Sequence, residues 1–232
     1  MLATVLEFLS KQVSPGISTK DLAEMAKIEI RKLGGQPTTL GYHGYPDVIC
    51  VSVNDEVVHG IPRTDHYINN GDIVGLDFCV TYRGMITDAA ISVLAGNASN
   101  EAIELVNVTK KSLIAGIGAV KAGNHVGDIS YAVQSVLEKN KKYGIVRDLV
   151  GHGVGYEMHE EPNIPNFGKK GTGIELLAGM TIAIEPMATS GGYDIITDSD
   201  DWTIRTRDGS LSAHFEHTVL VTEDGSEILT NI

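Results

Sequence analysis

The segment GLDFCVTYRGMITDAAISV, residues 75–93, contains two apolar runs joined by a short polar turn. Residues that favour strands are frequent in both runs, and Tyr82-Arg83-Gly84 supplies turn residues between them. The pattern predicts a β-hairpin with strands at Ile73–Tyr82 and Met85–Leu94.

Two acidic residues interrupt these apolar runs, Asp77 in the first and Asp88 in the second. Folding of the hairpin brings their carboxylates near each other across the strand pair. A buried carboxylate is costly, and a second one beside it raises the cost unless a cation lies between them. The pair therefore indicates a cation site. The alternative is that one aspartate lies at an exposed strand end and the other caps a turn.

The second half of the sequence repeats this combination of acids and apolar strands. Glu185 follows the predicted strand Thr181–Ile184, and Glu216 lies near the start of the predicted strand His214–Val221. His152 stands between glycines in GHGVG, which we interpret as keeping its side chain accessible. Four carboxylates with one imidazole suit Mn, Fe, Co or Zn, often as two ions that share bridging carboxylates. Alternatively, the glutamates face solvent and His152 lies in an exposed turn.

Two short segments repeat with a constant offset of 107 positions. Val13–Gly16 matches Val120–Gly123, and the following Asp21 matches Asp128. An amphipathic helical pattern follows each copy. We interpret the repeat as an internal duplication.

We expect a single domain over residues 1–232, with halves at about 1–98 and 99–232, because no low-complexity linker separates them. The second half opens with a helical pattern from Ser99 to about Ala122, and a further strand is expected at Val48–Val53. Two αβ halves that share one sheet give an α+β fold, and a site where they meet draws on both.

Charge and cysteine content exclude several classes of protein. The chain carries 18 basic and 30 acidic residues, a net charge of −12, and no Lys/Arg cluster, which argues against direct nucleic-acid binding. Only Cys50 and Cys79 are present, so we expect no disulfide framework and a reducing compartment. No apolar run approaches the ~18 residues of a membrane span and no basic leader opens the chain, so we expect a cytoplasmic protein.

Six motifs occur in the order and at the spacings of the type I, bacterial-type methionine aminopeptidases, and the resemblance covers essentially the whole chain. They are VVHGIP (57–62), the aspartate hairpin, GHGVG (151–155), MHEEP (158–162), TIAIEPM (181–187) and SAHFEHT (212–218). GYHGYP (41–46) also looks like the substrate-pocket loop of that family. The resemblance implies the pita-bread fold, in which two pseudo-twofold αβ halves surround a shared, mostly antiparallel sheet.

The resemblance also implies a ligand set for two divalent metal ions, which are Co, Mn, Fe or Zn. Asp77 would bind one metal, Asp88 and Glu216 would bridge both, and His152 and Glu185 would complete the other. The glycines beside His152 would then keep backbone bulk away from the metals.

The remaining implied site residues contact the substrate. His59 would hydrogen-bond the scissile amide, His159 would stabilise the carbonyl oxygen, and Glu185 would act as general base. The pocket for the methionine side chain would be formed by Tyr42, Tyr45, Cys50, Met158 and Trp202. The alternatives are a turn histidine at 59, a surface histidine at 159, and aromatic and Met residues that belong to the core.

Three positions depart from the family pattern. Thr39 stands where bacterial relatives usually have a small or thiol residue, and Met158 stands where an aromatic residue is common. His214 replaces the usual glutamine two residues before the last ligand, and adds either an extra ligand or a donor next to the ligands.

The function implied is a metalloaminopeptidase that removes the initiator methionine from nascent proteins by the attack of metal-activated water. Its partners would be nascent N-termini with methionine and a small second residue, close to the ribosome, and we expect a monomer without membrane contact. One alternative is a proline-specific peptidase of the same fold. Another is a non-catalytic pita-bread module that only binds partners.

Overall fold

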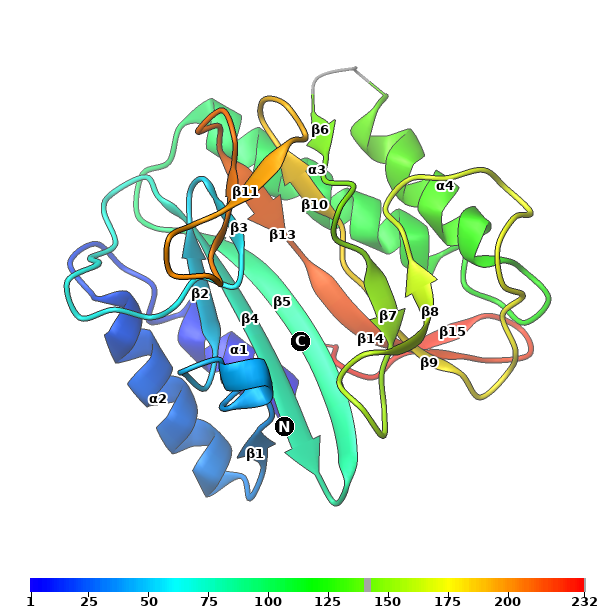
Figure 1. Cartoon of the computed structure of the whole chain (residues 1–232), viewed down its shortest axis with the longest axis horizontal. Helices are drawn as coiled ribbons and strands as arrows, with labels where there is room; N and C mark the ends of the chain where they lie inside the picture. Colours follow the sequence, from blue (N-terminus) through cyan, green and yellow to red (C-terminus); the bar gives the residue numbers. More distant parts are fainter. Residues whose placement is uncertain (140–142, 232) are drawn as a thin grey trace.

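The computed structural model describes residues 1–139 and 143–231 (Figure 1). The helices are α1 (Leu2–Ser10), α2 (Thr19–Lys32), the 3₁₀ turn η1 (Tyr42–Gly44), α3 (Asn100–Ile117) and α4 (Val126–Leu137). The strands of the first half are β1 (Gln36–Pro37), β2 (Cys50–Val53), β3 (Glu56–Val58), β4 (Ile73–Tyr82) and β5 (Met85–Leu94). Those of the second half are β6 (Gly144–Ile145), β7 (Gly151–Gly153), β8 (Glu160–Ile164), β9 (Thr181–Ile184), β10 (Met187–Thr189), β11 (Ile195–Thr197), β12 (Ile204–Thr206), β13 (Ser212–His214), β14 (Glu216–Val221) and β15 (Ser226–Ile228).

The hairpin of β4 and β5 has the predicted bounds at both ends. Tyr82 pairs with Met85, so Arg83 and Gly84 form a two-residue turn. Both turn residues have positive φ, 52° and 79°, as a type I′ turn requires. This turn matches the right-handed twist of the strands, which explains why alternation and turn residues together fix the register.

A nine-stranded sheet runs through the whole molecule in the order β1-β4-β5-β14-β9-β7-β8, with β2 on β4 and β15 on β14. The pairing of β5 with β14 joins the two halves, and we call this pairing the seam (Figure 1). Each strand pair found among the described residues is antiparallel. The α+β fold with a shared, mostly antiparallel sheet is confirmed.

The helices cover one face of this sheet and leave the other to the candidate site. Leu76 and Phe78 of β4 pack in a core cluster with α1 and α2, while Asp77 between them points to the opposite face. Ile182 and Val219 pack with α3 and α4 in the second cluster. Side chains therefore alternate between core and pocket along the central strands.

The two helix pairs follow the offset of the sequence repeat. α1 and α3 end 107 positions apart, and α2 and α4 begin 107 positions apart. Ser18 and His125 precede α2 and α4, and each donates its backbone N–H to the carboxylate three residues later, Asp21 or Asp128. The equivalent helix starts are consistent with a duplication, which stays a prediction.

Three predicted boundaries are wrong. The helix expected to about Ala122 ends at Ile117, where Gly116 and Gly118 lower helix propensity. The strand expected from Val48 begins at Cys50. The strand expected over His214–Val221 is divided at Phe215, because the facing residue is a proline, which has no N–H to continue the ladder.

Thr218 ties the two strands of the seam together. Its buried hydroxyl accepts a hydrogen bond from the Asp88 N–H at 2.9 Å and donates to the Asp88 carbonyl oxygen at 2.7 Å. We expect Thr218→Val to lower the free energy of unfolding by about 1–3 kcal/mol, because both Asp88 groups lose their partner in a buried place. Thr218→Ser keeps the hydroxyl and serves as the control in urea denaturation. A Val variant as stable as the Ser variant would contradict this prediction.

Candidate active site

A pocket lies at the seam and takes side chains from both halves of the chain. It is lined by Thr39, Tyr42, Tyr45, Cys50, Val58, His59, Asp77, Cys79, Asp88, Leu149, Val150, His152, Met158, His159, Glu185, Trp202 and Glu216. The structure thus brings every predicted site residue to one pocket. His214 is buried nearby but does not belong to the lining set.

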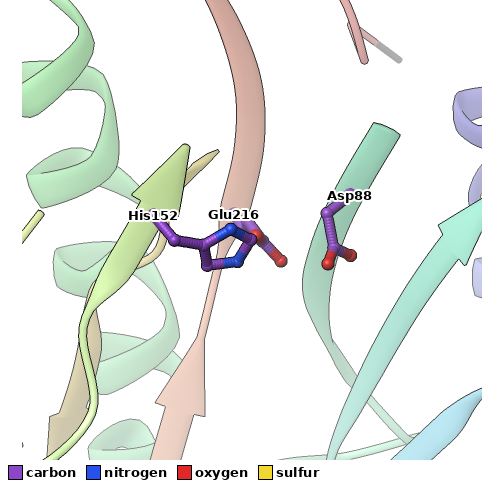
Figure 2. Close-up of side chains that lie close together, drawn as sticks. All are labelled: Asp88, His152 and Glu216. Atoms are coloured by element: carbon purple, nitrogen blue, oxygen red, sulfur yellow. The ribbon is translucent and has the colours of Figure 1, made fainter. Parts of the chain in front are cut away.

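Asp88, His152 and Glu216 form the tightest group in this pocket. One ligand atom from each lies within 4.8 Å of the others, and all three side chains are buried. Figure 2 shows them converging from three strands, β5, β7 and β14. The arrangement has the spacing that a single cation needs.

Asp77 lies next to this group beside Asp88, and Glu185 lies next to it beside His152. Asp77 lies diagonally across the hairpin from Asp88, because Cys79 is the residue that pairs with Asp88. Glu185 follows β9 directly, and its Oε1 lies 3.6 Å from His152 Nε2. The five predicted ligands therefore occupy adjacent positions along the sheet.

Crowding of these acids changes their protonation. Removal from bulk solvent raises the pKa of Asp77, Glu185 and Glu216 well above the usual range, and neighbouring carboxylates raise it further. Burial also raises the pKa of Asp88. In the protein alone, the carboxylates can relieve their repulsion only by holding protons.

The residues present fit divalent metal ions. Within the described ranges, Asp88 Oδ1 and Glu216 Oε1 are buried without a hydrogen-bond partner, a costly state for carboxylate oxygens that a cation relieves. His152 Nδ1 lies 2.9 Å from the Gly153 carbonyl oxygen and donates to it, which leaves Nε2 free as a ligand atom. Oxygen donors with one imidazole suit Mn, Fe, Co or Zn.

The glycines beside His152 have a different cause from the one expected. A Cβ at Gly151 would collide with the carbonyl oxygen of Ala183, and one at Gly153 with that of Glu161. Both obstacles are backbone atoms of the strands that pair with β7. Glycine is therefore required for β7 to fit between β8 and β9, and not to clear space around a metal.

His159 lies at the solvent-accessible edge of the pocket. Its Nδ1 is 2.8 Å from the Tyr42 hydroxyl, and its ring centroid is 4.4 Å from that of His152. Partial burial and then His152 lower the pKa of His159, so the ring is neutral near pH 7. If the Tyr42 hydroxyl donates to Nδ1, the proton of His159 is on Nε2.

His59 occupies a strained position on the other wall. Its φ of 59° is in the left-handed region, which non-glycine residues adopt rarely and mostly where the surroundings enforce it. Burial, and then His159, lower its pKa to about 4. Trp202 packs near this ring and against Tyr45, with centroid distances of 6.4 Å and 5.1 Å.

Some lining residues were missed by the sequence reasoning. Cys79 was noted only as a cysteine, yet it is two residues after Asp77, and alternation along β4 puts both on the pocket face. Val58 ends β3 and directly precedes the predicted His59, a position that alternation does not indicate. Leu149 and Val150 lie in an irregular segment, where no periodicity indicates their direction.

Comparisons with known proteins agree with this geometry. The model of metallopeptidase family M24 matches residues 1–223. The chain belongs to this family. It is 42% identical to methionine aminopeptidase 1 of Bacillus subtilis over 232 residues, which covers 100% of this chain and 93% of the relative. It is 44% identical over 230 residues to the methionine aminopeptidase of Clostridium acetobutylicum, covering 99% of this chain and 92% of the relative.

Solved structures with the same fold are also found. The methionine aminopeptidase of Thermotoga maritima superposes with a TM-score of 0.97 at 43% identity, covering 100% of this chain and 92% of that one. The prolidase of Pyrococcus furiosus has a TM-score of 0.76 at 20% identity, covering 99% and 60%, and shares the fold. The helices within the described residues are too short or too polar to cross a membrane.

Family membership and the raised carboxylate pKa values predict how metal binding depends on pH. The ligands must lose protons to bind a metal, and a raised pKa means that more of them hold protons as pH falls. We expect Mn²⁺ to bind more tightly at about pH 7.5 than at about pH 6, with release of protons. Isothermal titration calorimetry in two buffers of different ionisation enthalpy measures both quantities. Affinity independent of pH, without proton release, would show that these carboxylates do not hold the metal.

Proposed function

We propose that this protein is a metalloaminopeptidase that removes the N-terminal initiator methionine from nascent proteins. The observation that carries the proposal is one pocket that combines the buried group of Asp88, His152 and Glu216 with an apolar wall. Full-length similarity to several proteins named methionine aminopeptidase supports it.

We assign the metal ligands as Asp77, Asp88, His152, Glu185 and Glu216, holding two divalent ions. When bound, the metals supply an activated water and polarise the substrate carbonyl. Four carboxylates neutralise the charge of two dications, which explains why so many acids are tolerated in one pocket.

The chain's own residues then move the protons and hold the substrate. Glu185 accepts a proton from the attacking water and passes it to the leaving amine. His159 donates from Nε2 to the carbonyl oxygen as negative charge develops there, with Tyr42 holding the tautomer through Nδ1. His59 hydrogen-bonds the scissile amide, and its fixed backbone keeps that contact in place.

The methionine side chain enters between Tyr42, Tyr45, Cys50, Met158 and Trp202. The Tyr45 hydroxyl donates to the Gly60 carbonyl oxygen at 2.9 Å. The methionine side chain therefore contacts the apolar face and edge of the Tyr45 ring rather than its hydroxyl. Aromatic and sulfur-containing side chains suit a polarisable thioether.

We further propose action as a monomer in the cytoplasm, where nascent chains leave the ribosome. Cys50 and Cys79 are buried and free, in keeping with a reducing compartment. A proline-specific activity has weaker support, because the prolidase resemblance is at 20% identity.

The first test is hydrolysis of Met-Ala-Ser with Mn, Fe, Co and Zn supplied separately. We expect cleavage with at least one metal. Met-Ala and Met-Gly peptides should be cleaved at least about tenfold faster than Met-Lys and Met-Phe, the preference for a small second residue that the resemblance to methionine aminopeptidases implies. The control peptides have proline as their second residue and a first residue other than methionine. Faster cleavage of that control than of Met-Ala-Ser would favour the proline-specific alternative.

A pair of histidine variants separates coordination from catalysis. His152→Ala should lose metal from at least one site, and its activity should fall in parallel with metal content. His159→Ala should keep its metals and its fold, while kcat falls by roughly 10²–10³, the usual loss for one oxyanion donor. Metal analysis with steady-state kinetics decides. Loss of metal from the His159 variant, or normal turnover, would refute its assigned role.

A further inference from the structure

His214 is a buried histidine beside the pocket whose ring nitrogen lacks a partner. It ends β13 with 4% of its surface exposed, and its Nε2 has no hydrogen bond within the described ranges. Its backbone cannot shift easily, because its N–H donates to Ser92 Oγ at 2.9 Å and Ser92 Oγ donates to its carbonyl oxygen at 2.8 Å. An unpartnered buried nitrogen in a fixed position calls for a nearby acceptor or ligand.

The acidic group that faces this nitrogen is Glu185. His214 pairs with Met187 of β10, so Glu185 is its diagonal neighbour on the same face. The distance from His214 Nε2 to Glu185 Oε2 is 3.8 Å. The other carboxylate oxygen, Oε1, lies 3.6 Å from His152 Nε2. Glu185 is thus flanked by two imidazoles, each facing a different oxygen.

The position of the proton on its ring decides what His214 offers to Glu185. A neutral ring with a lone pair on Nε2 would face the carboxylate oxygen with repulsion, whereas a proton on Nε2 makes it a donor. A hydrogen bond needs about 2.7–3.2 Å, so a side-chain rotation that brings the atoms less than about 1 Å closer completes it.

We propose that His214 is a positioning residue that holds Glu185 Oε2 through its Nε2–H and thereby turns Oε1 toward His152. The inference rests on the proposed function, in which Glu185 binds metal and carries the proton. The position holds a glutamine in the family pattern, and the terminal amide nitrogen of glutamine reaches about as far from the backbone as Nε2 of histidine. The donor is thus retained while the side chain becomes a rigid ring.

The test compares two amides that differ by one methylene. In His214→Gln the amide nitrogen reaches the place of Nε2, whereas in His214→Asn it reaches only that of Nδ1. We expect the Gln variant to keep kcat on Met-Ala-Ser within about threefold, and the Asn variant to lose about tenfold in kcat with little change in KM, the usual effect of one hydrogen bond to a charged group. His217→Gln, on the opposite face of β14, is the matched control and should match wild type.

Cobalt loading shows whether His214 acts through Glu185 or binds metal itself. All three variants should bind as much Co²⁺ as wild type, and the visible absorption spectrum should change in the Asn variant alone, because only there does Glu185 lose its donor. Loss of Co²⁺ or an altered spectrum in both His214 variants would make His214 a ligand and overturn the positioning role. Wild-type kcat in the Asn variant would overturn it as well.

A measurement on wild-type protein tests the inference even if a variant misfolds or the enzyme shows no turnover. In the Zn²⁺-loaded protein labelled with ¹⁵N-histidine, the signal absent from His214→Gln identifies His214. We expect this signal to show a proton on Nε2 near pH 7, and a ring that is protonated on Nδ1 alone would refute the inference. If wild type cleaves no methionine peptide with any metal, the proposed function fails, while the NMR result still decides the role of His214 in holding Glu185.

Discussion

The mutual repulsion of four carboxyl groups in one pocket constrains the rest of this structure. They lie on or beside β4, β5, β9 and β14, which are consecutive neighbours in the sheet. Backbone hydrogen bonds hold these strands in register, so the acids cannot move apart to reduce their repulsion. Only protons or cations can neutralise them, because no group among the described residues pairs with Asp88 Oδ1 or Glu216 Oε1.

The seam explains why this arrangement needs both halves of the chain. Glu216 pairs with Ala90 of β5, which places it beside Asp88 from the first half. Thr218 fixes the same strand pair through the backbone of Asp88. Because the helices pack on the other face, the pocket face is left open for the acidic side chains. Neither half alone brings Asp88 and Glu216 together.

The sequence predicts the features that depend on a local pattern of residues. It does not predict the features that depend on contacts between distant segments. The hairpin bounds follow from alternation and turn residues, and the same alternation could have identified Cys79. The pairing of β5 with β14 joins residues far apart in sequence, so no local pattern specifies it. The glycines beside His152 were misinterpreted for the same reason, since the carbonyl groups of Ala183 and Glu161 that require them belong to other strands.

The break between β13 and β14 at Phe215 lies next to the two glutamates of the site. Ile184 pairs with His217 and Met187 pairs with His214, so the register continues across the gap and puts Glu185 opposite Glu216. Like charges directly opposite each other destabilise an antiparallel pair. Pro186 removes one backbone donor at this point, and the N–H of Phe215 reaches the Pro186 carbonyl oxygen at a long 3.3 Å. The ladder therefore lacks one backbone hydrogen bond next to the two facing glutamates, and a divalent cation bound there would offset their charges.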